Sequence, residues 1–98
     1  MFKITKQDTA SCRRLVVEGE LNEQSLAELR RQWRSSSEEL GGRKLVIELA
    51  GITLIKMDGE EGIRGLLREG AEFSAKELYT RHVLSQLERR ACDTANHE

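Results

Sequence analysis

The sequence of this chain has no proline, only two cysteines and almost no net charge. Because no proline-rich or serine-rich linker, repeat or low-complexity run divides its 98 residues, we expect one small domain over residues 1–92. The polar residues 93–98 are expected to fray. The 16 basic residues are balanced by 17 acidic ones, which gives a net charge of −1. This balance argues against nucleic acid as a partner, since no overall basic field exists to hold a polyanion.

The two cysteines, Cys12 and Cys92, lie near opposite ends of the chain and match no metal-ligand or redox spacing. We therefore expect two free thiols in a reducing compartment, with no metal and no cofactor. The sequence also has no apolar stretch long enough to cross a membrane and no basic-then-apolar leader after Met1. These absences favour a cytoplasmic protein without direct membrane insertion.

The first half of the chain predicts two strands and a helix. Apolar residues at Phe2 and Ile4, and then over 15–17, indicate the strands. Asn22 is placed to cap a helix that starts at Glu23. The staple and apolar stripe of this helix and the glycines that end it are Leu21, Leu26, Leu29, Trp33, Leu40, Gly41 and Gly42.

The middle of the chain contains two apolar runs of strand length, Lys44–Leu49 and Ile52–Ile55. Neither run alternates strictly with polar residues, so we expect both to be buried on two faces. The break at Ala50-Gly51 is too short for a parallel crossover. A kink or bulge within one long strand is therefore favoured over two separate strands.

Two further helix starts are predicted from capping-box patterns, Asp58 with Glu61 and Ser74 with Glu77. A strand before the second start and a last helix over about 76–90 complete the order β-β-α-β-β-α-β-α. We expect an α/β fold whose mixed, mostly parallel sheet packs against helices. The predicted staple and apolar stripe of the last helix are Phe73, Leu78, Tyr79, Val83, Leu84, Leu87 and Ala91.

Catalytic chemistry finds little support in the sequence. Of the two histidines, His97 lies in the expected tail and His82 on a helix. A nucleophile, a base and an orienting group would all have to converge on His82, so we do not expect an enzyme. A small enzyme or metal protein with a site at His82, Glu77 and Glu88 is the least favoured alternative.

Three glycines, Gly59, Gly62 and Gly65, recur on the helix that follows the apolar runs, and each interior glycine weakens a helix by about 1 kcal/mol. Close packing of the helix on the strand beneath it is the favoured explanation. A second, compatible explanation is adaptability, because a weakened helix start could shift or become ordered when a partner docks.

The strand-to-helix segment resembles the STAS domains, a family found in anti-sigma factor antagonists and sulfate-transporter tails. The order of elements fits the family over roughly residues 2–87. In phosphorylated members the acceptor is the hydroxyl residue directly after an aspartate, and these positions are Lys56 and Met57 here. A methionine cannot take a phosphoryl group. The residues that carry the resemblance are Glu48, Leu49, Ala50, Gly51, Ile52, Thr53, Leu54, Ile55, Lys56, Met57, Asp58 and Gly59.

The resemblance implies a non-enzymatic STAS-like module of signal transduction, whose helix start binds a partner protein, commonly an anti-sigma factor with kinase activity. An accessory subunit of a lipid or anion transport complex is the alternative, and a homo-oligomer stays open. Met57, the degenerate phosphoacceptor position, is either a contact residue or part of the core. Thr53 is a poor substitute acceptor if its strand is buried. The expected partner-binding residues are Lys56, Met57, Asp58, Gly59, Glu60 and Glu61, whose acids favour a basic partner.

Overall fold

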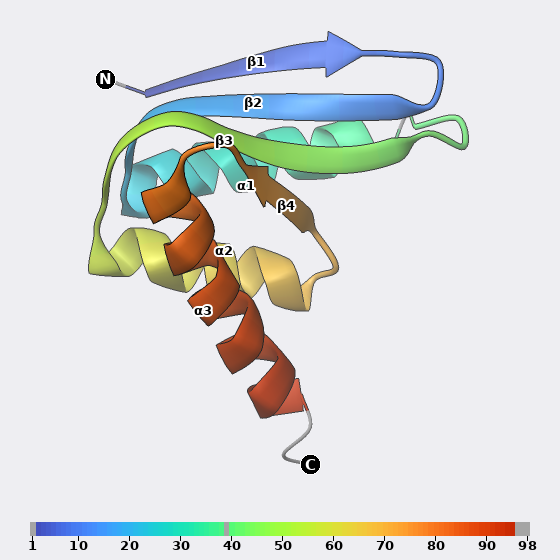
Figure 1. Cartoon of the computed structure of the whole chain (residues 1–98). Coiled ribbons are helices and arrows are strands. Elements are labelled where there is room, and N and C mark those ends of the chain that lie inside the picture. The colour runs from blue at the N-terminus through green and yellow to red at the C-terminus, as the bar shows by residue number, and fades with distance from the viewer. Residues whose placement is uncertain (1, 39, 96–98) are drawn as a thin grey trace.

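The computed structural model describes residues 2–38 and 40–95, with side chains described as far as residue 89. An α/β fold is confirmed, with four strands and three helices in the described residues (Figure 1). The elements in chain order are β1 (Phe2–Asp8), β2 (Cys12–Leu21), α1 (Glu23–Ser37), β3 (Lys44–Ile55), α2 (Met57–Arg68), β4 (Glu72–Ala75) and α3 (Leu78–Ala95).

Strand β3 is continuous, so the break at Ala50-Gly51 is an irregularity within one strand, as the favoured interpretation predicts. Gly51 has a φ of +60°, a left-handed conformation that glycine adopts at little cost. The register between β3 and β2 shifts twice here, on either side of Gly19. Bulges of this kind bend a strand and increase its twist. Figure 1 shows β3 curving toward α2 beyond this point.

The sheet has the strand order β1-β2-β3-β4. Strand β1 pairs with β2 in antiparallel fashion, whereas β2 with β3 and β3 with β4 are parallel pairs. Each parallel pair is joined through a helix, α1 in the first case and α2 in the second, because parallel neighbours need a crossover. The expected mixed, mostly parallel sheet is therefore confirmed.

One hydrophobic core lies between the sheet and the helices, which sit together on one side of it (Figure 1). Leucines of all three helices reach the strands there, and the predicted staple pair of α1 is part of the same core. The buried core residues are Leu15, Val17, Leu21, Leu26, Leu29, Ile47, Leu49, Ile55, Ile63, Leu66, Ala71, Leu84 and Leu87.

The expectation that β3 is buried on two faces holds at its centre, where the consecutive residues 47–49 are all buried, and is wrong for its second half. Alternation along the strands places Arg14 and Glu48 on the sheet face opposite the core. Glu48 is only 7% exposed, and its carboxylate pairs with Arg14 at 3.0 Å and with Lys76 at 3.6 Å. In the second half of β3, Thr53 and Leu54 are exposed. The apolar run over residues 52–55 therefore does not indicate burial on both faces.

Helix α1 begins as predicted but ends early. Asn22 is its N-cap, and the side-chain oxygen accepts a hydrogen bond from the backbone N–H of Ser25 at 2.9 Å. The helix ends at Ser37, before the pair Gly41-Gly42, so Leu40 does not extend its apolar stripe. The serine run at this end favours local side-chain hydrogen bonds over a longer helix.

The two predicted capping boxes are not formed. Helix α2 begins at Met57, one residue before Asp58, so the carboxylate of Asp58 is inside the helix rather than at its N-cap. Ser74 lies within β4 and pairs along β3, and α3 begins only at Leu78. At Asp58 the helix starts earlier than the capping pattern indicates. At Ser74 the strand continues past the indicated start, because pairing with β3 outweighs a local signal.

Helix α3 uses only part of its predicted stripe. Leu84 and Leu87 are buried and Val83 is partly buried, whereas Tyr79 is exposed. The helix continues to Ala95, past the expected start of the tail, and residues 96–98 lie outside the described part. The side chains predicted at Ala91 and Cys92 also lie outside it. None of the described helices is long and apolar enough to span a membrane.

Candidate functional site

Helix α2 starts directly at the end of β3, and we call residues 56–61 the α2 start. Lys56 is the N-cap, and its backbone N–H donates to the carbonyl oxygen of Leu21, 2.9 Å away at the end of β2. The side chain of Lys56 makes no capping hydrogen bond, because an ammonium group has no acceptor. The first turn of α2 therefore presents backbone donors that no capping side chain accepts.

The six predicted partner-binding residues form an exposed rim over a buried base. Gly59 is buried and Glu60 is partly buried. Met57 is 79% exposed, so the interpretation of Met57 as a core residue is wrong. The structure brings the other members together around a shallow hollow of about 400 Å³, and these are Lys56, Met57, Asp58 and Glu61.

The charge at the α2 start is mainly negative. Asp58 lies in the first turn, where a carboxylate interacts favourably with the helix dipole. Asp58 and Glu61 also line a groove of about 500 Å³ between α1 and α2, with Glu23 on the α1 side. Arg30 lines the same groove, but its guanidinium pairs with Glu69 at 3.5 Å. The α2 start and the groove beside it therefore expose several carboxylates.

The glycines of α2 allow close packing, as the favoured explanation predicts. A Cβ added to Gly59 would collide with the main-chain carbonyl of Leu21, and one added to Gly62 would lie 2.6 Å from Cβ of Leu26. A Cβ on Gly65 would meet only the guanidinium end of an α1 arginine, also at 2.6 Å. The packing partner is therefore the end of β2 at Gly59, but helix α1 rather than a strand at the other two.

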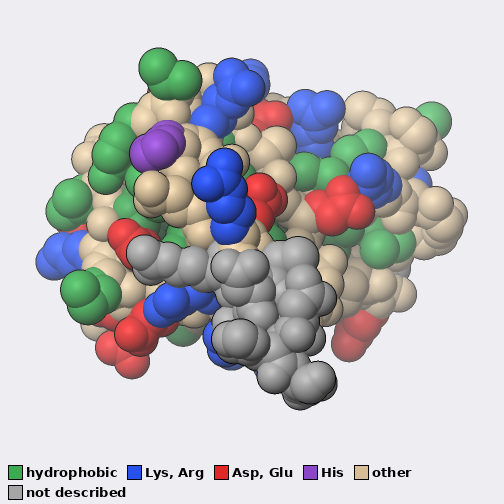
Figure 2. Space-filling model, turned by 60° about the horizontal axis from the view of Figure 1, so that its bottom comes forward, with side chains coloured by type: hydrophobic (Ala, Val, Ile, Leu, Met, Phe, Trp, Pro, Cys, Tyr) green, Lys and Arg blue, Asp and Glu red, His purple; other side chains and the backbone are tan. Residues whose placement is uncertain are grey.

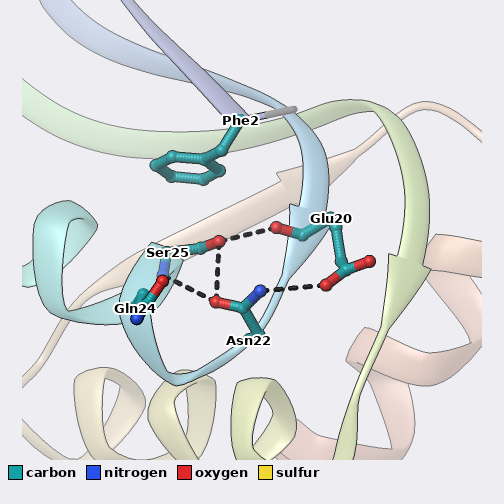
Figure 3. Close-up of a pocket in the computed structure, with 5 residues that line it drawn as sticks. All are labelled: Phe2, Glu20, Asn22, Gln24 and Ser25. Atoms are coloured by element: carbon teal, nitrogen blue, oxygen red, sulfur yellow. Dashed lines mark hydrogen bonds between the residues drawn. The ribbon is translucent and has the colours of Figure 1, made fainter.

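Hydrogen bonds among Glu20, Asn22 and Ser25 hold the N-terminus of α1 (Figure 3), and an ion pair joins Glu20 to the α2 start. Asn22 Nδ2 donates to Glu20 Oε2 at 2.9 Å, and Ser25 Oγ donates to the main-chain oxygen of Glu20 at 2.7 Å. Lys56 Nζ lies 3.7 Å from the same Oε2. The ring of Phe2 lies over this network, beside a cavity of about 310 Å³. The Asn22 cap is visible in the sequence, but the ion pair between residues 20 and 56 has no local signal.

Four large hydrophobic side chains are exposed among the described residues, Leu54 (46%), Met57 (79%), Leu78 (82%) and Tyr79 (63%). The sequence predicts burial for Leu54, Leu78 and Tyr79, and these predictions are wrong. Leu54 lies beyond the last residue of β3 that pairs with β4, and α3 starts later than expected. Thr53 is also exposed, so the reason for discounting it as a phosphoacceptor does not hold.

No protein-family model and no curated protein matches this chain. The resemblance to the STAS domains therefore rests on residues 48–59 and on the order of strands and helices.

The alternative residues His82, Glu77 and Glu88 do not form a group of metal ligands. Glu77 Oε1 instead accepts a hydrogen bond from the N–H of Gly51, 2.9 Å away. His82 and Glu88 are exposed on α3, and the described side chains include no group of three His, Cys, Asp or Glu placed to hold a metal ion. Figure 2 shows a face of the molecule on which basic, acidic and hydrophobic side chains are interspersed, without a large area of one charge.

Other titratable side chains have local partners. A hydrogen bond from Arg13 lowers the pKa of Asp8 at the end of β1. Hydrogen bonds from Arg31 and Gln32 lower the pKa of Glu28 on α1. Cys12 carries a free thiol. None of these residues belongs to the α2 start, where the exposed side chain of Met57 lies beside Asp58 and Glu61.

Proposed function

We propose that this chain is a non-enzymatic protein-interaction module of STAS type, which binds a partner protein at the α2 start. The observation that carries the proposal is the exposure of Met57 at 79%, in the first residue of a helix and beside Asp58 and Glu61. A flexible apolar side chain inside a charged rim is typical of the centre of a protein contact. The mixed sheet and the strand-to-helix junction support the STAS assignment.

The partner class follows from the resemblance and from the charge. Members of the family that act as anti-sigma factor antagonists bind an anti-sigma factor with kinase activity, and we propose a partner of this class. Its contact surface would carry basic residues, since Asp58, Glu61 and Glu23 face the solvent around Met57. Charges of this kind act mainly on the association rate and on the choice of partner.

Docking at this surface is constitutive rather than switched by phosphorylation. Met57 stands where phosphorylated members have a hydroxyl, so no phosphate can be added there. The α2 start is also held in place, because the N–H of Lys56 is bonded to Leu21 and Gly59 packs on the same main chain. A preformed site pays little ordering cost on binding. Adaptability of the glycine-containing helix remains a separate prediction.

The experiment compares capture of partners from cells of the source organism by three immobilised proteins, wild type, Met57→Lys and Ala10→Lys. Ala10 is exposed in the β1–β2 turn, at the other end of the sheet from the α2 start, and matches the added charge. Quantitative mass spectrometry should find a protein with an ATP-binding kinase domain that Met57→Lys captures about tenfold less well and Ala10→Lys captures normally.

Two results would contradict the proposal. Equal capture by all three proteins would remove Met57 from the contact. Constitutive capture of a transporter's ATPase in place of a kinase would instead support the alternative, an accessory subunit of a transport complex. Phosphoprotein analysis of the same samples tests the absence of a switch, and Thr53 must be included because its hydroxyl group belongs to an exposed residue.

A further inference from the structure

Strand β3 continues beyond the strand that covers its edge. Strand β4 pairs only with Val46–Leu49, whereas β3 runs on to Ile55. Over Ile52–Ile55 the pairing is with β2 alone, among the residues that the structure describes. This part of β3 is therefore a free sheet edge, and we call residues 51–55 the β3 edge. Its extended chain is about 17 Å long, the length of a short strand.

Two hydrogen bonds give the donor direction at the two ends of the β3 edge. Lys56 N–H donates toward β2, to Leu21, whereas Gly51 N–H donates in the opposite direction, to the carboxylate of Glu77. Because adjacent N–H groups of a strand point to opposite sides, the N–H of Ile55, next to Lys56, also points away from β2. Glu77 thus satisfies the outward donor at the beginning of the edge, and among the described residues no strand pairs with its end on this side.

The exposed hydrophobic residues belong to this edge or to the segments at its two ends. Leu54 is in it, Met57 follows two residues after its end, and Leu78 and Tyr79 follow directly after Glu77, which is bonded to its beginning. These are the four large hydrophobic residues that are exposed in the described part of the chain. Proteins usually protect a free edge with lysine, proline or a covering segment, and an edge with exposed apolar residues is a template for pairing.

We infer that the partner adds an extended segment of its chain as a short strand along the β3 edge, with apolar side chains at alternate positions over Leu54 and Met57. The inference rests on the proposed function and names how the partner is recognised. Main-chain groups of an edge are matched by main-chain groups of an extended chain, and pockets for alternate side chains give specificity. The starts of α3 and α2 stand at the two ends of the edge. The free edge between them has the length of one short strand, which matches a short extended segment of a partner rather than the longer edge of a second copy.

The test uses a phage library of random linear peptides of about 12 residues, selected on the immobilised full-length protein. Selected peptides should contain apolar residues at every second position and should bind Leu54→Lys about tenfold or more weakly than Ala10→Lys. N-methylation at successive peptide residues should weaken binding by a similar factor at alternate positions only, since only those N–H groups face β3. Amide exchange by NMR should slow at Ile55 when the peptide binds.

Several outcomes would overturn strand addition. These are a selection without specific binders, apolar residues at helical spacing, N-methylation effects without alternation, and a concentration-dependent dimer that protects Ile55 without peptide. The N-methylation result does not depend on how any variant folds. If Met57→Lys abolishes capture of the partner while Leu54→Lys does not, strand addition fails and the proposed function stands. If no partner depends on Met57, the proposed function fails instead.

Discussion

Two strand-to-helix connections in this molecule solve the same structural problem in different ways. Where β2 leads into α1, Asn22 caps the helix, and its partner residue Ser25 is buried. Where β3 leads into α2, the N-cap is Lys56, which makes no capping bond, and the next residue is an exposed methionine. The first connection has the capping side chain that helix starts favour. The second has no such side chain, and it exposes a large apolar residue.

The difference teaches where stability and function lie. Residues that break a local rule in a folded protein are expected at functional sites. At any other site, a single substitution could restore the rule and stabilise the protein. Here the second connection is still held firmly, by the bond from Lys56 to Leu21 and by the contact of Gly59 with the same residue. The missing cap and the exposed Met57 are therefore compatible with an ordered surface that binds another protein.

The largest expected effect comes from breaking the contact between the two connections. Gly59→Ala should destabilise the protein by about 2 kcal/mol, because the new Cβ meets the main chain of Leu21, which cannot rotate away. Urea denaturation measures the change in the free energy of unfolding. Alanine normally stabilises a helix interior relative to glycine by about 1 kcal/mol, so the sign itself is informative.

The matched control is Gly65→Ala on the same helix. Its Cβ would meet only the mobile end of the Arg30 side chain, so we expect unchanged or slightly increased stability. Equal effects of the two substitutions would show that close packing does not explain why these positions are glycine.

Much of the fold follows from local signals, as three particular residues show. Asn22 predicts a helix start because its capping bond spans only three residues. Gly51 predicts a kink rather than a second strand because no crossover fits in two residues. Gly59 predicts close packing because a helix tolerates glycine poorly, although the sequence does not name Leu21 as the neighbour.

The sequence indicates where the candidate site lies along the chain, but not which side chains around it are exposed. The six residues of the α2 start lie together as expected, because they are consecutive. The exposure of Leu54 and Leu78 depends on where β4 ends and where α3 begins, and these ends are decided by pairing with β3. The capping pattern at Ser74 fails for the same reason, since a local pattern carries no information about how far a neighbouring strand extends. The pattern at Asp58 fails differently, because α2 starts before it.

The regular connection can be broken directly. Asn22→Ala should lower the free energy of unfolding by about 1 to 2 kcal/mol, because it removes the helix cap and the hydrogen bond to Glu20 together. Gln24→Ala, at an exposed neighbouring position, should change it by less than about 0.5 kcal/mol. A cost of Asn22→Ala no larger than that of Gln24→Ala would mean that the first connection owes its stability to packing alone.

The smallest expected effect comes from giving α2 the capping side chain that it lacks. Both Lys56→Ser and Lys56→Ala remove the exposed ion pair with Glu20, which contributes little, so their difference isolates the cap. Lys56→Ser should be more stable than Lys56→Ala by about 1 kcal/mol in urea denaturation, because a serine oxygen accepts from the first turn. Equal stability of the two variants would mean that the α2 start gains nothing from a cap, and the contrast with Asn22 would then lose its energetic basis. If Lys56→Ser is more stable than Lys56→Ala but captures the partner more weakly, this helix start is kept uncapped for binding.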